Sequence, residues 1–228
     1  MLSIIIPTFN EAAFIAQLLA AVAKIPEPVE VIVVDGGSDD ETAQIVRCHG
    51  VRLIKSERGR GAQMHAGARA SRGEALWFLH ADTQPAPESA QLIAEALRDP
   101  HVVGGNFNVS FDSTRFAARF LTWLYRQLRR LGLCYGDSAI FVRRETYLRA
   151  GGFKPFPIFE DLDLVQRLRK HGQLVELPKG VITSSRRFEG RSFFMTFARW
   201  TFLQMLYWAG VDPRTLGKLY VQIREPKL

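Results

Sequence analysis

The strongest constraint on the fold is an alternation of short apolar runs with segments of helical periodicity in the first half of the chain. Four runs rich in aliphatic residues predict strands, at Leu2–Ile6, Val29–Val34, Val51–Lys55 and Ala75–Leu79. The segments between them, beginning with the amphipathic Ala12–Ala23, predict helices. Continuous apolar strands separated by helices are typical of a mainly parallel sheet covered on both faces, so we expect an α/β protein with a Rossmann-like sheet.

Charge and cysteine content limit the classes of binding partner and the cellular compartment that we expect. The 228 residues include 30 Lys and Arg against 23 Asp and Glu, a formal net charge of +7, which favours anionic partners such as nucleotides or phospholipid headgroups. The basic residues are dispersed and no nucleic-acid-binding motif accompanies them, so we expect no nucleic-acid partner. Cys48 and Cys134 lack metal-ligand spacing, and the first residues have the pattern of a strand rather than of a signal peptide, so we expect reduced thiols and a cytoplasmic location.

We expect one domain over residues 1–228. Within it we predict a nucleotide-binding half at about 1–111, an acceptor half at about 112–190 and a C-terminal helical extension at about 191–228, divisions that follow the change in sequence pattern. The oligomeric state is left open.

The second half is less regular than the first. Val102–Phe111 and Ser138–Val142 predict further strands, and Thr114–Leu131 and Phe193–Trp208 predict amphipathic helices. These helices either pack on the sheet or lie on a bilayer surface, which leaves peripheral membrane contact open. We expect no membrane-spanning segment, because polar residues interrupt the longest apolar region.

Polar residues follow three of the predicted strands, at Pro7–Glu11, Asp35–Ser38 and His80–Asp82. The carboxyl ends of parallel strands meet at one edge of a sheet, and ligands of such folds bind there. A single Asp at a strand end is usually a helix cap, and Ser38–Glu41 has the spacing of a capping box that would start a helix through Cys48. Several polar strand ends on one edge nevertheless predict a binding site.

Motifs that are absent exclude several nucleotide-binding and catalytic classes. No GxGxxG follows the first strand, and neither GxxxxGK[ST] nor GxSxG occurs in the chain, which weighs against dinucleotide-binding, P-loop and α/β-hydrolase proteins. The acidic segment Glu160–Asp163 is more informative. One acid there suits the first turn of a helix, whereas three exceed what capping needs, so one of them is a candidate general base.

Five ordered motifs together resemble family 2 glycosyltransferases, which have the GT-A fold. They are Pro7–Glu11, Val33–Asp40, the His80–Asp82 turn, Gly151–Phe153 and Glu160–Asp161. A narrower likeness, carried by Gly59–Gly67 and Phe78–Thr83, is to a short, soluble bacterial subgroup with an HAD turn in place of the two-acid DxD turn. The resemblance covers the chain from the first strand to about residue 177.

The resemblance implies an inverting transfer of a sugar from a nucleotide-diphosphate donor, with UDP as the expected nucleotide, to an acceptor hydroxyl, assisted by Mg or Mn. Asp161 would be the base that activates the acceptor, and Asp82 would hold the metal at the diphosphate. Phe9 would stack on the nucleotide base, Asp35 would accept a hydrogen bond from it, and Glu11 would lie near the nucleoside. The implied nucleotide-binding residues are Pro7, Thr8, Phe9, Glu11, Asp35, Arg60 and Ala81.

His80 stands where relatives usually carry a carboxylate, and three roles stay open for it. It donates a hydrogen bond to the nucleotide, binds the metal with Asp82, or packs at the strand end. Two functional alternatives also remain: a membrane-surface transferase with a polyprenyl-phosphate acceptor, and a sugar-nucleotide-binding protein without catalysis.

Arginines are further candidates for holding the diphosphate, because guanidinium pairs well with phosphate oxygens. They are Arg58, Arg60, Arg186 and Arg187. Where many relatives have a metal-binding histidine after the last core strand, this chain has Ser184 and Ser185, a departure from the family pattern.

Overall fold

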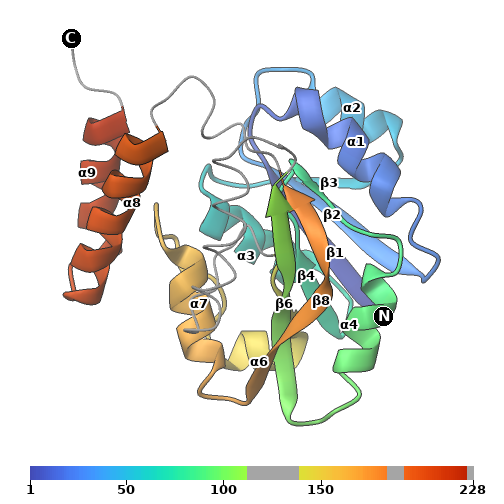
Figure 1. Ribbon diagram of the computed structural model, residues 1–228. Coiled ribbons are helices and arrows are strands. Elements are labelled where there is room, and N and C mark those ends of the chain that lie inside the picture. The colour runs from blue at the N-terminus through green and yellow to red at the C-terminus, as the bar shows by residue number, and fades with distance from the viewer. Residues whose placement is uncertain (112–138, 184–192, 225–228) are drawn as a thin grey trace.

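The computed structural model describes residues 1–111, 139–183 and 193–224 and shows a sheet between two layers of helices (Figure 1). In chain order the elements are β1 (Leu2–Thr8), α1 (Ala12–Val22), β2 (Val29–Asp35), α2 (Thr42–Cys48), β3 (Arg52–Lys55), α3 (Arg60–Ala70), β4 (Ala75–Phe78), β5 (Thr83–Gln84), α4 (Ser89–Ala96), β6 (Val102–Phe111), β7 (Phe141–Arg143), α6 (Arg144–Arg149), α7 (Glu160–Leu168), β8 (Gln173–Thr183), α8 (Phe193–Trp208) and α9 (Pro213–Arg224). The predicted Thr114–Leu131 helix, Ser138, Ser184, Ser185, Arg186 and Arg187 lie outside the described residues.

The strands in the described residues form one sheet in the order β3-β2-β1-β4-β7-β6-β8-β5. β3, β2, β1 and β4 are parallel to one another, β7 is antiparallel to both of its neighbours, and β6 and β8 are again parallel. The mainly parallel sheet predicted from the apolar runs is therefore confirmed. β8 and the short β5 were not predicted, and they extend the sheet at the edge far from β3.

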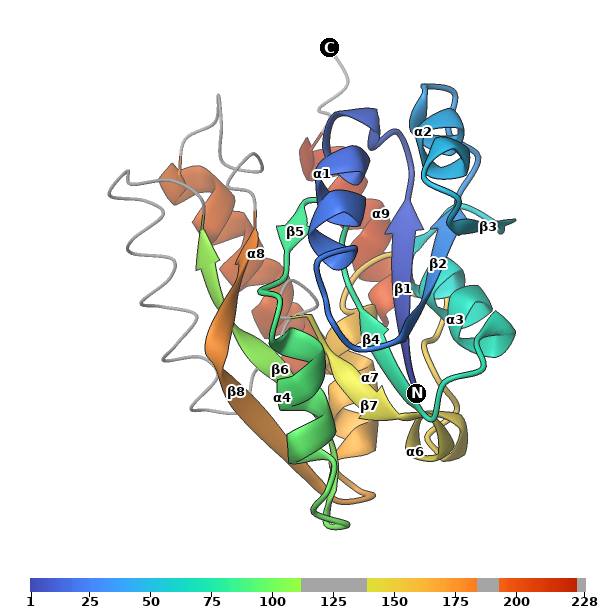
Figure 2. The same ribbon diagram turned by 90° about the vertical axis from the view of Figure 1, so that its right-hand side faces the viewer.

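Alternate residues of the strands supply two separate cores. On one face of β1, Ile4 and Ile6 pack with residues of α1, α2 and α4, including Leu18 and Ile93. On the other face, Ile5 packs with residues of α3, α6 and α7. Figure 2 shows these two sets of helices on opposite sides of the sheet. Burial of both faces explains why the parallel strands are continuously apolar.

Pairing of the strands aligns the candidate loops at one edge. Thr8 at the end of β1 pairs with Asp35 at the end of β2, and Asp35 pairs with Lys55 at the end of β3. The chain leaves β4 on the other side of β1, where the Leu79 N–H donates to the carbonyl of Ile5 at 3.0 Å. The register thus brings the three predicted polar strand ends to the same edge of the sheet.

The capping box predicted at Ser38–Glu41 is wrong, because the helix begins only at Thr42 and no side chain caps it at Glu41. The Ser38 hydroxyl instead donates to Asp35 at 2.5 Å. Asp40 accepts hydrogen bonds from the Thr42 N–H at 2.9 Å and from the Ala12 N–H at 3.0 Å. Burial raises the pKa of Asp40, but these bonds and that of the Thr42 hydroxyl outweigh it and hold the pKa below its ordinary value. One carboxylate thus joins the start of α2 to the start of α1.

The two C-terminal helices, α8 and α9, lie beside each other next to α7, at the side of the molecule away from β1 and β2 (Figure 1). Leu203 of α8 and Leu216 of α9 form a small core with Ile158, Phe159 and Leu162 at the start of α7. The helix predicted at Phe193–Trp208 is confirmed as α8. No helix within the described segments is long and apolar enough to cross a membrane.

Candidate active site at the carboxyl edge of the sheet

Asp35 shapes the loop that follows β2. Its side chain is buried, and its carboxylate accepts hydrogen bonds from the N–H groups of Gly37 and Ser38 at 3.2 Å and from the Ser38 hydroxyl at 2.5 Å. Ser38 in turn accepts a hydrogen bond from the Asn10 N–H at 2.9 Å. Asp35, which was predicted to bind the nucleotide base, is therefore the centre of a hydrogen-bond network that joins the loop after β2 to the loop after β1.

Gln63 on α3 is a third component of this edge, and no functional role was predicted for it. Its side-chain amide donates to the carbonyl of Thr8 at 2.7 Å and to that of Val34 at 2.8 Å, and its carbonyl oxygen accepts from the Gly59 N–H at 3.3 Å. The side chain is buried. Gln63 thereby fixes the ends of β1 and β2 to the loop before α3. Its place in the Gly59–Gly67 run was the only signal available in the sequence.

Phe9, which follows β1, contacts Arg58 in the loop between β3 and α3. The Arg58 guanidinium carbon lies 3.8 Å from the centroid of the Phe9 ring, a cation–π geometry. Arg58 therefore covers one face of the ring predicted to stack on the base, and a base stacked on Phe9 would lie on the opposite face. Glu11 lies at the start of α1, where its N–H donates to the Thr42 hydroxyl at 2.8 Å.

The turn after β4 carries His80, Ala81 and Asp82. The Thr83 N–H donates to the His80 carbonyl at 3.0 Å, which closes the turn, and Ala81 is buried while His80 and Asp82 are half-buried. No cluster of three His, Cys, Asp or Glu side chains with metal-site geometry occurs in the described part of the chain. A carboxylate with at most one further side chain nevertheless suits Mg²⁺, which is commonly held by one or two carboxylates together with substrate phosphates. The turn therefore fits an ion that is completed by the diphosphate.

Arg60 at the start of α3 forms an ion pair with Glu160 at the start of α7. The Arg60 Nε lies 2.9 Å from Oε1 of Glu160, whose side chain is only 2% exposed. A Cβ atom on Gly61 would lie 2.3 Å from the carbonyl oxygen of Lys154, so the two segments can approach this closely only because residue 61 is glycine. The predicted diphosphate-binding arginine is thus held by the acidic segment.

The three acids of Glu160–Asp163 have different surroundings. Asp163 is held by the Arg167 guanidinium, with an Nε–Oδ2 distance of 2.9 Å, and by Lys154 at 3.2 Å. Asp161 is 7% exposed, and its Oδ1 accepts the Leu162 N–H at 2.7 Å. Glu160 and Asp163 are each engaged by an arginine on either side of Asp161, so the backbone that carries Asp161 is fixed in two places.

Phe159 starts α7 in a left-handed conformation, with φ of 62°. Asn10 (φ 55°) and Ala139 (φ 51°) share this conformation, and both also lie at the carboxyl edge, next to β1 and β7 respectively. Such strain in non-glycine residues persists where surrounding contacts enforce it, and it clusters at functional sites. For Phe159 those contacts are the rings of Trp200 and Tyr207 on α8, with centroids 6.2 Å and 4.9 Å away.

The Gly151–Phe153 motif has a structural role, because it packs against Tyr147 of α6 and His65 of α3. The Tyr147 hydroxyl accepts the Phe153 N–H at 3.0 Å and lies 3.0 Å from Nδ1 of His65. Burial and the nearby Arg69 lower the pKa of His65, which favours the neutral form of the imidazole that lies against the Tyr147 hydroxyl. Gly152 has φ of 64°, and an added Cβ would lie 2.6 Å from the His65 ring.

Residues 3–151 match the family described as Glycosyl transferase family 2, which is more than half of the chain. The undecaprenyl-phosphate 4-deoxy-4-formamido-L-arabinose transferase of Pseudomonas fluorescens is 33% identical over 165 residues, 65% of this chain and 48% of that protein. The chain therefore spans about half the length of this curated relative.

Two solved structures show the same fold at low identity. The S. aureus TarS 1-349 structure in complex with UDP-GlcNAc has a TM-score of 0.66 and 20% identity, covering 85% of this chain and 60% of that one. The mannosyltransferase PcManGT from Pyrobaculum calidifontis, in complex with GDP-Man and Mn²⁺, has a TM-score of 0.68 and 21% identity, covering 97% and 69% respectively. The GT-A fold expected from the motifs is confirmed.

Proposed function

The chain belongs to glycosyl transferase family 2, and we propose on that premise that it transfers a sugar from a nucleoside-diphosphate donor to an acceptor hydroxyl, with inversion at the anomeric carbon. UDP is the nucleotide expected for the donor. The solved structures of similar fold that contain UDP-GlcNAc or GDP-Man support a donor of this class.

The observation that carries the proposal is the ion pair between Arg60 and Glu160. Gln63 ties the ends of β1 and β2 to α3, and Arg60, on the first turn of the same helix, holds the residue next to Asp161. The polar strand ends proposed to bind the nucleotide are thereby linked to the acid proposed as the base. A buried carboxylate fixed at one end of a nucleotide-binding edge is the arrangement that base-assisted transfer requires.

In the proposed reaction, Asp161 accepts the proton of the acceptor hydroxyl while that oxygen forms a bond to the anomeric carbon. The bond from this carbon to the diphosphate oxygen breaks, and the electron pair leaves with the nucleoside diphosphate. Attack from the face opposite the leaving group inverts the configuration, as in other inverting transfers at an anomeric carbon. Mg²⁺ or Mn²⁺, held by Asp82 with or without His80, would neutralise the negative charge on the departing diphosphate.

The remaining predicted residues have supporting roles in this proposal. Asp35 orders the loop after β2, so that the end of this strand faces the nucleotide base of the donor. Phe9 offers a ring face on which that nucleotide base stacks. Pro7 and Thr8, which are buried at the end of β1, and Ala81, which is buried in the turn after β4, bring backbone close to the nucleotide. Glu11 lies at the same edge, near the nucleoside.

A thermal-shift screen of UDP- and GDP-linked sugars, each with and without Mn²⁺, tests the proposed donor class. A ligand that binds only the folded protein adds about 2.7 kcal/mol to the free energy of unfolding at a hundredfold excess over Kd. It therefore raises the melting temperature. We expect one nucleotide sugar to stabilise the protein more strongly when Mn²⁺ is present. No stabilisation by any nucleotide sugar, with or without metal, would contradict the proposal.

A lipid-phosphate acceptor is the second candidate, favoured by the name of the Pseudomonas fluorescens relative, an undecaprenyl-phosphate transferase. A phosphate acceptor and a hydroxyl acceptor differ in whether they need a general base. A phosphate monoester is already largely deprotonated at neutral pH, so its oxygen needs no general base, whereas a hydroxyl does. Asp161→Asn should therefore slow transfer to a hydroxyl by about a hundredfold or more while leaving most of the transfer to a polyprenyl phosphate.

A further inference from the structure

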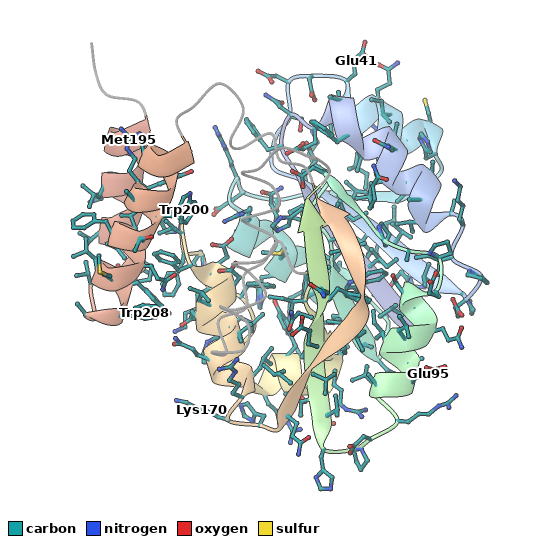
Figure 3. All side chains as sticks on the ribbon, viewed as in Figure 1. Glu41, Glu95, Lys170, Met195, Trp200 and Trp208 are labelled. Carbon is teal, nitrogen blue, oxygen red and sulfur yellow. The ribbon has the colours of Figure 1, made fainter. Side chains whose placement is uncertain are left out.

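One face of α8 exposes large apolar side chains along its whole length. Met195, Phe202, Met205 and Trp208, called the α8 stripe here, are between 47% and 56% exposed. Their spacings of seven, three and three residues place them on one side of a helix. In Figure 3 the labelled Met195 and Trp208 lie at the two ends of the C-terminal hairpin, which consists of α8 and α9. Contiguous exposed apolar surface of this kind marks an interaction site.

The opposite face of α8 already has its packing partners. Leu203 is fully buried against α7 and α9, and the rings of Trp200 and Tyr207 contact Phe159. Rotating α8 to bury the stripe would expose this inner face, so the helix cannot hide both. The stripe is therefore a surface of the folded molecule rather than a core face in the wrong orientation.

The charges on α8 and α9 indicate what kind of surface the stripe contacts. Residues 193–224 contain four basic side chains, Arg199, Arg214, Lys218 and Arg224, and one acidic side chain, Asp212. Arg199, Arg214 and Lys218 are exposed. A helix pair that exposes an apolar face and carries four basic residues with a single acid is complementary to the interface of an anionic lipid bilayer.

We propose that α8 docks flat on an anionic bilayer surface, with the α8 stripe inserted between the headgroups and the basic side chains at the phosphate level. A second copy of the chain fits this face less well. A two-fold contact through the stripe would bring the Arg199 side chains of both copies into one interface, where Asp212 is the only acid on the hairpin.

Docking would also place the candidate active site near the lipid. The inner face of α8 rests on Phe159, two residues before Asp161, so the start of α7 lies one helix away from the bilayer. An acceptor attached to a lipid would then reach the site without leaving the membrane. The docking surface itself does not depend on the proposed reaction, because it involves neither the nucleotide nor Asp161.

Flotation of the purified protein with vesicles tests the docking surface. We expect binding to phosphatidylcholine vesicles that contain about a third phosphatidylglycerol, weaker binding to pure phosphatidylcholine, and weaker binding at high salt. The triple variant Phe202→Ser, Met205→Ser, Trp208→Ser should lower the partition coefficient at least about tenfold, since insertion scales with apolar area. Arg199→Gln should weaken binding to anionic vesicles only.

Leu148→Ser is the matched control, because Leu148 is an exposed leucine (40%) on α6, away from the hairpin. It should float as the wild type does, and so should Asp161→Asn, which separates docking from catalysis. Absence of cofloating wild-type protein, or equal flotation of the triple variant, would overturn the proposal. So would sedimentation showing a lipid-free dimer that the triple variant dissociates, because the stripe would then belong to a second copy.

Discussion

The two sides of the candidate site are held in place by different forces. On the side proposed to bind the nucleotide, called the nucleotide side, Asp35, Gln63 and Asp40 fix the loops through hydrogen bonds to backbone groups near the strand ends. On the side proposed to bind the acceptor, called the α7 side, the start of α7 is fixed by the Arg60–Glu160 and Arg167–Asp163 ion pairs and by aromatic rings from α8. The first side is held by hydrogen bonds between side chains and backbone groups, and the second by contacts between side chains.

This difference has a functional consequence. Loops anchored by buried backbone hydrogen bonds keep one geometry, which suits recognition of an invariant nucleotide. The ion pairs and ring contacts on the other side instead fix the start of α7, which carries the acid proposed as the general base. Substitutions on the nucleotide side should therefore affect donor binding, whereas those on the α7 side should affect turnover.

The largest effect is expected for Asp161→Asn. Removal of a general base typically slows transfer by about a hundredfold to ten thousandfold, while the neutral amide keeps the size of the side chain. The turnover number with a hydroxyl acceptor and the affinity for the donor should be measured together. Asp163→Asn is the control on the same helical turn, and it should affect stability more than turnover because Asp163 pairs with Arg167. Equal losses of turnover in both variants would remove the special role of Asp161.

Gln63→Ala should have the next largest effect, now on the nucleotide side. It removes two buried hydrogen bonds to the carbonyls of Thr8 and Val34, each worth about 0.5–1.5 kcal/mol, while the Thr8 carbonyl still accepts the Gly36 N–H. We expect lower stability toward urea and weaker donor binding, with turnover at saturating donor nearly unchanged. Gln91→Ala, which removes an exposed side-chain contact to Glu95 on α4, provides the control and should be close to neutral. A turnover defect without a binding defect would reverse the division of roles.

Trp200→Ala tests the α7 side through its aromatic support. Truncating this partly buried ring should cost about 2 kcal/mol, less than for a fully buried tryptophan. It should also lower turnover, because Phe159 loses a contact that holds its left-handed backbone. Trp208→Ala on the same helix removes an exposed ring and should leave transfer to a water-soluble acceptor unchanged. The prediction fails if the two variants show the same turnover.

The smallest effect that we expect is a dependence of stability on pH, contributed by His65. Burial and Arg69 lower the pKa of His65 in the folded state relative to about 6.5 in the unfolded chain, so the folded state binds fewer protons. This contribution to stability is complete above about pH 6.5 and is lost as the pH falls toward the folded-state value. Melting temperatures of the wild type and His65→Gln should therefore converge on acidification. Parallel curves would show that the His65 contact with Tyr147 contributes no pH dependence.

The sequence predicted the sheet well because its signal is local. Continuous apolar runs such as Val29–Val34 and Ala75–Leu79 lie within a residue of the observed strands. The polar strand ends could also be placed together, because parallel strands share a carboxyl edge. β8 was missed as a strand because Gln173–Thr183 contains Gln, Glu, Pro, Lys and Gly and lacks a continuous apolar run.

The contacts within the site were less accessible to sequence reasoning. The capping box failed because Asp35 competes for the Ser38 hydroxyl, a contact that depends on loop geometry. Arg60 was predicted to face the diphosphate, and nothing in its local sequence indicated a pairing with Glu160, one hundred residues away in the chain. Contacts of Phe159 with α8 are equally long-range. Such pairings depend on how helices from distant parts of the chain pack together.

The most direct test of the division between the two sides is a calorimetric titration of the nucleoside diphosphate identified in the screen. It should be carried out with and without Mn²⁺ on the wild type, Asp82→Ala and Asp161→Asn. We predict that Asp82→Ala loses the Mn²⁺-dependent part of the affinity, and that Asp161→Asn binds as the wild type does. Unchanged metal dependence in Asp82→Ala, or loss of nucleotide binding in Asp161→Asn, would contradict the assignment of donor binding to one side and catalysis to the other.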